Sequence, residues 1–128
     1  MLVVIDTNIL VSALWSRSGL PAKFVSLLFT GEIIACYDYR LLQEYRQVLA
    51  REKFGFTKWE INSLIDWIVE QGISVIAPES NDFFIDESDK KFYEVAKYCN
   101  ALLVTGNKKH YPNDENIISV KEFFDQMI

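Results

Sequence analysis

Residues 2–8 read LVVIDTN, and this stretch decides the fold. Its four apolar residues, three of them β-branched, form the short continuous run that is typical of a strand buried on both faces of a parallel sheet. The run ends at Asp6, which is followed by the small polar residues Thr7 and Asn8. Ligands in open α/β sheets bind beyond the carboxyl ends of the strands. The stretch therefore predicts a buried strand with polar groups at the edge where a site would form.

Further strands and helices alternate along the rest of the chain. This alternation favours an α/β domain around a mostly parallel sheet of four or five strands with right-handed crossovers. The length of 128 residues and the lack of any linker-like stretch predict a single domain over residues 1–128. Apolar runs predict the other strands at residues 33–36, 73–77, 101–104 and 116–118. Helical spacing predicts helices over residues 8–15, 21–29, 38–49, 57–71, 86–99 and from 119 onward. Asp38 is a predicted helix cap, and the Ser/Thr-x-x-Glu patterns that begin at Thr57 and Ser119 predict capping boxes.

The charge balance argues against a broad nucleic-acid-binding surface. The chain has 13 Lys and Arg residues against 18 Asp and Glu residues, a net charge of −5, which is the wrong sign for gripping phosphates over a large area. Any such binding must be local, although acids gathered around divalent cations would invert the local field.

Cysteine usage and hydropathy bound the compartment. Cys36 and Cys99 stand in separate apolar contexts without metal-ligand spacing, so we expect both to be reduced and buried. No apolar run approaches the roughly 20 residues of a membrane span, and Met1 leads directly into the first strand without a basic leader. We therefore expect a cytoplasmic protein without membrane contact.

Four acids stand at positions that the topology could bring together. Asp6 follows the first strand, Glu44 lies inside a helix, and Asp86 and Asp89 precede another helix. Taken singly, each acid has an ordinary explanation as a helix cap or as a solvated side chain. Their convergence in one crevice would be costly unless cations occupied it. Carboxylate oxygens without His or Cys are ligands suited to Mg²⁺ or Mn²⁺.

Four segments together resemble a known family. They read VVIDTNIL at residues 3–10, LLQEY at residues 41–45, DESD at residues 86–89 and LVTGN at residues 103–107. In this order and at these separations they resemble the motifs of PIN domains over nearly the whole chain. The resemblance is closest to bacterial PIN proteins that are toxin components of toxin–antitoxin pairs, relatives of VapC-like toxins.

The resemblance implies a three-layer α/β/α sandwich and a metal-dependent nuclease, usually an endoribonuclease that uses Mg²⁺ or Mn²⁺. Asp6, Glu44 and Asp89 match the first three family acids, with Asp86 as an auxiliary candidate. Asn107 stands where many members have a fourth Asp, eighteen positions after Asp89. Its carbonyl oxygen can still ligate a hard cation, so both a one-ion and a two-ion site stay open.

Small polar residues and lysines complete the predicted site. Thr7, Asn8 and Thr105 resemble the family residues that hold phosphate or hydrogen-bond the acids, and local helix capping is the alternative interpretation. Lys108 and Lys109 could meet substrate phosphates at the rim of the crevice. The same interpretation applies to Arg17, Lys90 and Lys91, whereas His110 is expected in a solvated loop.

Two other functions compete with the ribonuclease. Because Asn107 removes a charge, a non-catalytic PIN-like module that binds RNA or a protein is the alternative. A phosphotransfer enzyme with Asp6 as nucleophile is disfavoured, because Asn8 offers no acid to protonate the leaving group. For partners we expect an RNA substrate. The wide apolar face of the helix over residues 57–71 also suggests a homodimer or a cognate antitoxin.

Overall fold

Strand β1 lies at the centre of a five-stranded sheet in the computed structural model, which describes residues 1–84 and 86–127. The strand order is β3-β2-β1-β4-β5, and every neighbouring pair is parallel. Val3 and Val4 are fully buried, as their apolar run predicts. The strands are β1 (Leu2–Ile5), β2 (Ile34–Tyr37), β3 (Ile73–Ser74), β4 (Leu102–Val104) and β5 (Ile117–Ile118).

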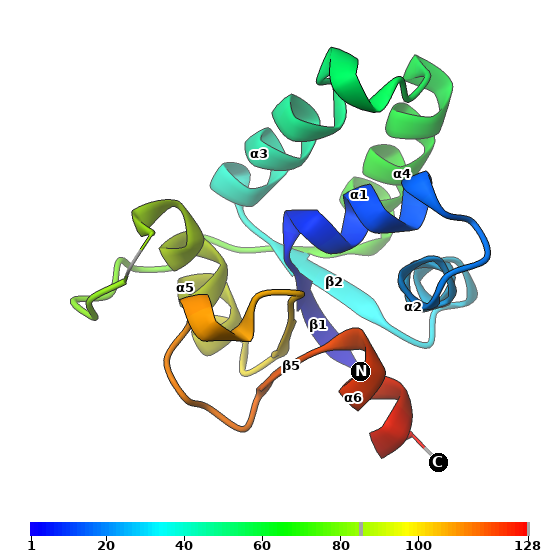
Figure 1. Cartoon of the computed structure of the whole chain (residues 1–128). Coiled ribbons are helices and arrows are strands. Elements are labelled where there is room, and N and C mark those ends of the chain that lie inside the picture. The colour runs from blue at the N-terminus through cyan, green and yellow to red at the C-terminus, as the bar shows by residue number, and fades with distance from the viewer. Residues whose placement is uncertain (85, 128) are drawn as a thin grey trace.

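Helices cover both faces of this sheet, which gives the predicted three-layer α/β/α sandwich (Figure 1). Helix α5 packs on one face against β1, β2 and β4, and α3 lies beside it while also contacting α4. Helices α1, α2, α4 and α6 gather on the other face. The helices are α1 (Thr7–Trp15), α2 (Leu20–Thr30), α3 (Tyr39–Leu49), α4 (Lys58–Gln71), α5 (Lys90–Cys99) and α6 (Val120–Gln126), with short 3₁₀ turns at Glu52–Phe54, Glu87–Asp89 and Lys108–His110.

The helix ends follow the predicted capping chemistry. Asp38 accepts a hydrogen bond from the Leu41 amide at the start of α3. Complete capping boxes open α4, where Thr57 and Glu60 bond reciprocally, and α6, where the box begins at Ser119. These local bonds fix where each helix enters the fold.

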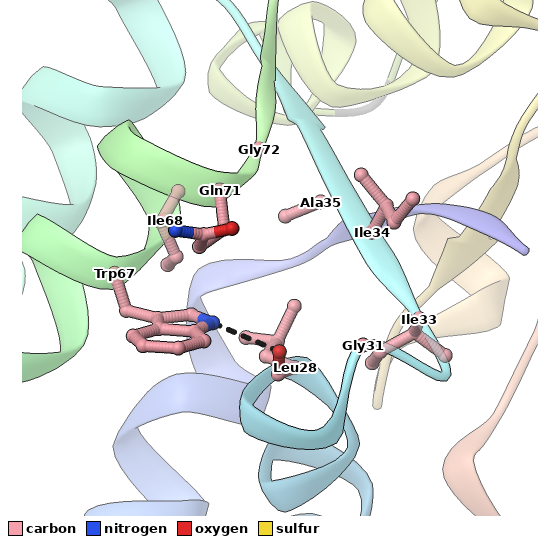
Figure 2. Close-up of a pocket in the computed structure, with 9 residues that line it drawn as sticks. All are labelled: Leu28, Gly31, Ile33, Ile34, Ala35, Trp67, Ile68, Gln71 and Gly72. Atoms are coloured by element: carbon pink, nitrogen blue, oxygen red, sulfur yellow. Dashed lines mark hydrogen bonds between the residues drawn. The ribbon is translucent and has the colours of Figure 1, made fainter.

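The seam between α2, β2 and α4 is lined mostly by apolar residues (Figure 2). It encloses a mostly apolar cavity of about 150 Å³ near the start of β2, at the end of that strand opposite Asp38. The Trp67 indole donates to the Leu28 carbonyl oxygen at 2.8 Å across the seam. A Cβ at Gly72 would come within 2.6 Å of the Ala35 carbonyl oxygen, so only glycine permits this close approach.

Two expectations about the secondary structure need correction. The strand predicted over residues 73–77 covers only Ile73–Ser74, because β2 ends at Tyr37 and offers its last carbonyl to the Val75 amide. Ile76 is consequently 92% exposed. The acidic segment at residues 86–89 forms a 3₁₀ turn, and α5 begins only after it.

One of the two cysteines also differs from expectation. Cys36 is buried and Cys99 only partly so, and both are free. Burial and the neighbouring Cys99 thiol raise the pKa of Cys36 to about 12, so it stays protonated near neutral pH.

The predicted domain limit at residue 128 lies outside the described residues. Among those residues, no helix is both long and apolar enough to cross a bilayer.

Candidate metal centre

Asp6 stands directly after β1 and is almost completely buried, with 4% of its surface exposed. The Thr105 hydroxyl donates to its Oδ2 at 2.7 Å, and the Tyr111 hydroxyl donates to the same oxygen at 3.2 Å. Its amide donates to the Val104 carbonyl at 3.0 Å, which ties the ends of β1 and β4 together. Burial raises the pKa of Asp6, and the nearby Glu44 carboxylate adds to this effect. A carboxylate is thus held in a costly position by neutral donors.

Glu44 approaches from α3. The helix is fixed beside the end of β1 because the buried Tyr45 hydroxyl donates to the Ile5 carbonyl at 2.5 Å. The Thr7 hydroxyl donates to Glu44 Oε2. The Lys91 ammonium lies 2.8 Å from the other oxygen, Oε1. Both oxygens of Glu44 therefore already have partners from other elements.

Asp89 closes the 3₁₀ turn before α5 and lies close enough to Asp6 for the two charges to interact. Its Oδ2 lies 3.2 Å from Nδ1 of His110. Burial raises the pKa of Asp89, with further contributions from the negative charges of Asp6 and Asp86. Three acids from three separate elements therefore share one electrostatic environment beyond the carboxyl ends of the strands.

The other predicted residues occupy varied places around these acids. Thr105 is buried, and its hydroxyl also accepts the Asn107 amide at 3.0 Å. Asn8 is exposed in the first turn of α1. Asp86 accepts from the amide and the hydroxyl of Ser88, at 2.9 and 2.7 Å, and these bonds lower its pKa. Asp86 thus serves as a turn cap here.

The basic residues predicted to contact phosphate differ in their surroundings. Lys108 pairs with Glu122 of α6 at 2.9 Å, and Lys109 is exposed. Arg17 pairs with Glu60 at 2.7 Å on the side of α1 and α4, so it does not join the crevice. Among the lysines and arginines considered from the sequence, Lys91 contacts the predicted ligand Glu44, and His110 contacts Asp89.

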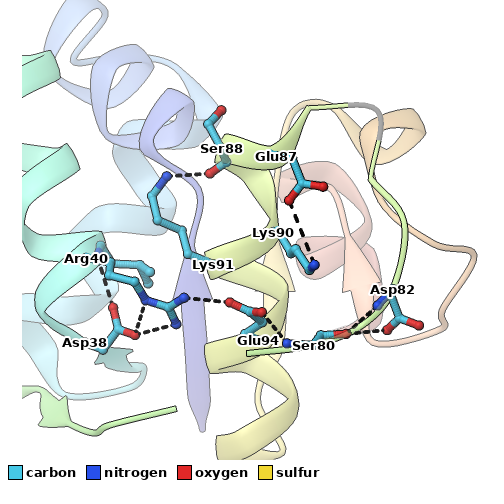
Figure 3. A network of polar contacts seen from close by, with 10 residues as sticks. Asp38, Arg40, Ser80, Asp82, Glu87, Ser88, Lys90, Lys91 and Glu94 are labelled. Atoms are coloured by element: carbon cyan, nitrogen blue, oxygen red, sulfur yellow. Dashed lines mark hydrogen bonds and ion pairs between the residues drawn. The ribbon is translucent and has the colours of Figure 1, made fainter. Parts of the chain in front are cut away.

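Sequence reasoning missed two features that hold the crevice together. The first is Tyr111, which is buried and bonds to Asp6 across 105 positions, a separation that no local pattern signals. The second is an ion network between α3 and α5 (Figure 3). In it Arg40 contacts Asp38 at 2.7 Å and Glu94 at 2.6 Å, and both carboxylates are buried.

The donor set fits a divalent cation in chemistry. Carboxylate oxygens from Asp6 and Asp89 and the Asn107 carbonyl are hard ligands, and burial of Asp6 beside two other acids would be relieved by a cation. As the side chains stand, however, the described residues contain no group of three His, Cys, Asp or Glu residues close enough to hold a metal. The engagement of Glu44 by Lys91 and Thr7 is consistent with that finding.

The fold is an α/β/α sandwich with acids at the carboxyl edge of a parallel sheet. This arrangement resembles that of metal-using hydrolases, but a fold alone supports such a function only by analogy. Comparison with known proteins places the chain more firmly. The family model described as PIN domain matches residues 2–109, and the chain belongs to that family, whose members are generally nucleases that use divalent metals such as Mg²⁺ or Mn²⁺.

The chain also resembles an uncharacterized protein of Methanocaldococcus jannaschii. The two are 31% identical over 109 residues, which cover 83% of this chain and 70% of the relative. No solved structure matches the chain significantly. These comparisons establish that the chain belongs to the PIN domain family.

Proposed function

We propose that this protein is a divalent-metal-dependent endoribonuclease and that it serves as the toxin component of a toxin–antitoxin pair. The observation that supports the nuclease proposal is the burial of the Asp6 carboxylate at the end of β1, where it interacts electrostatically with Glu44 and Asp89 from two other elements. Membership of the PIN domain family supports the reaction class. The toxin role rests on the resemblance of the four sequence motifs to VapC-like relatives.

Each residue has a proposed part in phosphodiester hydrolysis. Asp6, Asp89 and the Asn107 carbonyl would hold Mg²⁺ or Mn²⁺, with Glu44 beside them. The bound cation would supply Lewis-acid activation of the phosphate and of the attacking water. Thr105 and Tyr111 orient Asp6 through their hydroxyls. Thr7 orients Glu44 in the same way. The proposal also keeps Asp86 as an auxiliary metal ligand. It keeps Asn8, Lys108 and Lys109 as contacts to phosphate.

Cleavage of a mixed pool of single-stranded and structured RNA tests the nuclease proposal. We expect cutting in Mn²⁺ or Mg²⁺ by the wild type and none by Asp6→Asn or Asp89→Asn, which remove a ligand charge. The matched control is Asp66→Asn, the same chemical change on the exposed face of α4. Equal rates in Asp6→Asn and wild type would refute the assignment, and cutting lost in Asp66→Asn as well would indicate a folding defect or a contaminant.

The toxin role has its own test in growth. Induced expression in a bacterial host should stop growth for the wild type and not for Asp6→Asn. The homodimer and the antitoxin partner are proposals that rest on the resemblance and on an apolar groove between α1, α2 and α4, where Trp59 is 75% exposed. Size-exclusion chromatography that gives only a monomer would remove the homodimer.

A second candidate function is a non-catalytic PIN-like module that binds RNA or a protein. Two observations favour this candidate. Asn107 is neutral, and the described residues contain no group of three His, Cys, Asp or Glu residues close enough to hold a metal. It predicts no Mn²⁺-dependent rise in melting temperature and no cleavage of any RNA. A rise of several degrees would count against it, because a ligand that binds only the folded state stabilises that state.

A further inference from the structure

The Lys91 ammonium occupies a defined position inside the candidate metal centre. It lies 2.8 Å from Glu44 Oε1 and donates to the Ser88 carbonyl oxygen, in the turn that carries Asp89. Its side chain is only 17% exposed, and the ammonium lies 5.2 Å from the centre of the Phe92 ring. Figure 3 shows Lys91 extending toward Ser88, whereas Lys90 extends from α5 toward Glu87. The ammonium is thus held by contacts with two separate elements.

The charges around Lys91 point to the number of metal ions. The candidate metal centre has the three carboxylates of Asp6, Glu44 and Asp89, whose charges interact, and the fourth family position is the neutral Asn107. Because Lys91 neutralises Glu44, the charge that remains is that of Asp6 and Asp89, which one divalent cation balances. A second divalent cation at Glu44 would lie close to the ammonium and would be repelled by it.

We propose that Lys91 is a built-in cation that takes the place of a second metal ion, so that this site binds a single Mg²⁺ or Mn²⁺ and Lys91 supplies the other positive charge. This inference rests on the proposed metal-dependent nuclease. In two-metal sites the ions lie roughly 3.5–4 Å apart and stabilise opposite sides of the scissile phosphate. An ammonium fixed on Glu44 supplies charge at one of these sides without being a metal ligand.

Titration of the metal-free protein with Mn²⁺ tests the inference, with calorimetry and electron paramagnetic resonance as readouts. The wild type should bind one ion. Lys91→Gln frees Glu44 and removes a repulsive charge, so it should bind a second ion. Even with the dielectric constant of water, removing a unit charge about 4 Å from a divalent ion strengthens its binding at least tenfold.

Lys90→Gln is the matched control. It removes the same charge from the same helix, but its partner at 3.9 Å is the exposed Glu87, which is not one of the proposed metal ligands. It should keep the one-ion stoichiometry and the wild-type affinity. Lys91→Arg retains the charge and should also bind one ion, which separates the charge from a structural role of the side chain. Melting curves of the metal-free variants check that each is folded.

The outcomes separate this inference from the proposed function. Two tightly bound ions in the wild type, or equal binding by Lys91→Gln and Lys90→Gln, would overturn the role of Lys91 even if RNA is cut. One ion in the wild type and a second in Lys91→Gln would support that role even if no RNA is cut, and the nuclease proposal would then fail alone. No Mn²⁺ binding by any variant would overturn both.

Discussion

The Arg40 network allows a stability prediction worked from its geometry. Arg40 donates to Asp38 Oδ2 through Nε at 2.9 Å and through Nη2 at 2.7 Å, and to Glu94 Oε1 through Nη1 at 2.6 Å. The two carboxylate side chains are only 7% and 3% exposed. Arg40→Met keeps an unbranched apolar side chain but leaves two buried charges without their cation.

The expected loss in the free energy of unfolding is large. Removing one partner of a buried ion pair costs about 3–5 kcal/mol, because the remaining charge stays desolvated. Arg40 itself is 36% exposed, so water can partly replace it, and the lower end of that range applies. For a chain of this length 1 kcal/mol corresponds to about 4 °C, so a loss of about 3 kcal/mol lowers the melting temperature by about 12 °C.

Urea and thermal unfolding followed by far-ultraviolet circular dichroism measure this loss. The control is Arg46→Met, in which an exposed arginine of the same helix, without an ion pair among the described side chains, is changed in the same way. Adding Glu94→Gln to Arg40→Met removes one stranded charge and should restore part of the loss. The reasoning is refuted if Arg40→Met is as stable as Arg46→Met, or if the added Glu94→Gln destabilises the protein further.

Three more predictions concern the seam and Asp6. Gly72→Ala should lose about 2 kcal/mol, because its Cβ would meet two backbone carbonyl oxygens at 2.4 and 2.6 Å. Gly106→Ala is the control, because its Cβ would meet nothing within 4 Å, and its urea midpoint should equal that of the wild type. Equal urea midpoints for Gly72→Ala and Gly106→Ala would contradict the predicted clash at Gly72. Tyr111→Phe should lose about 1.5 kcal/mol in urea unfolding, because a bond to a buried carboxylate disappears, and an unchanged midpoint would mean that the bond contributes nothing. Burial raises the pKa of Asp6, so protonation of Asp6 contributes stability that is present below pH 3.8 and lost as the pH rises through the raised pKa. In the presence of a chelator, Asp6→Asn should therefore have a higher free energy of unfolding than the wild type at pH 7, and this difference should become smaller toward acid pH. A lower free energy of unfolding for Asp6→Asn at pH 7 would refute this prediction.

The sequence predicted those parts of the fold whose causes are local. The capping boxes at Thr57 and Ser119 depend on residues three positions apart, and both are present. The apolar run of β1 predicted a buried central strand because a strand covered on both faces needs no polar alternation. Strand β3 was predicted too long, since its length depends on where β2 ends.

The candidate site divides in the same way. Asp6 and Thr105 were predictable as neighbours because each directly follows a strand of a parallel sheet, and the structure joins them at 2.7 Å. The contact of Tyr111 with Asp6 and the bridge from Arg40 to Glu94 link residues 105 and 54 positions apart. Such pairs depend on how helices and loops pack, which no spacing rule in one sequence contains.

The central position of β1 has a consequence for how the protein is made. β1 is synthesised well before its neighbour β4, and the donors Thr105 and Tyr111 follow Asp6 by 99 and 105 positions. A nascent chain that ends before Thr105 therefore has Asp6 at an open sheet edge without either hydroxyl. Because contacts between distant segments must wait for the later segment, Asp6 cannot gain these two hydrogen bonds until synthesis has passed Tyr111. The strand order alone therefore delays completion of the candidate site during synthesis.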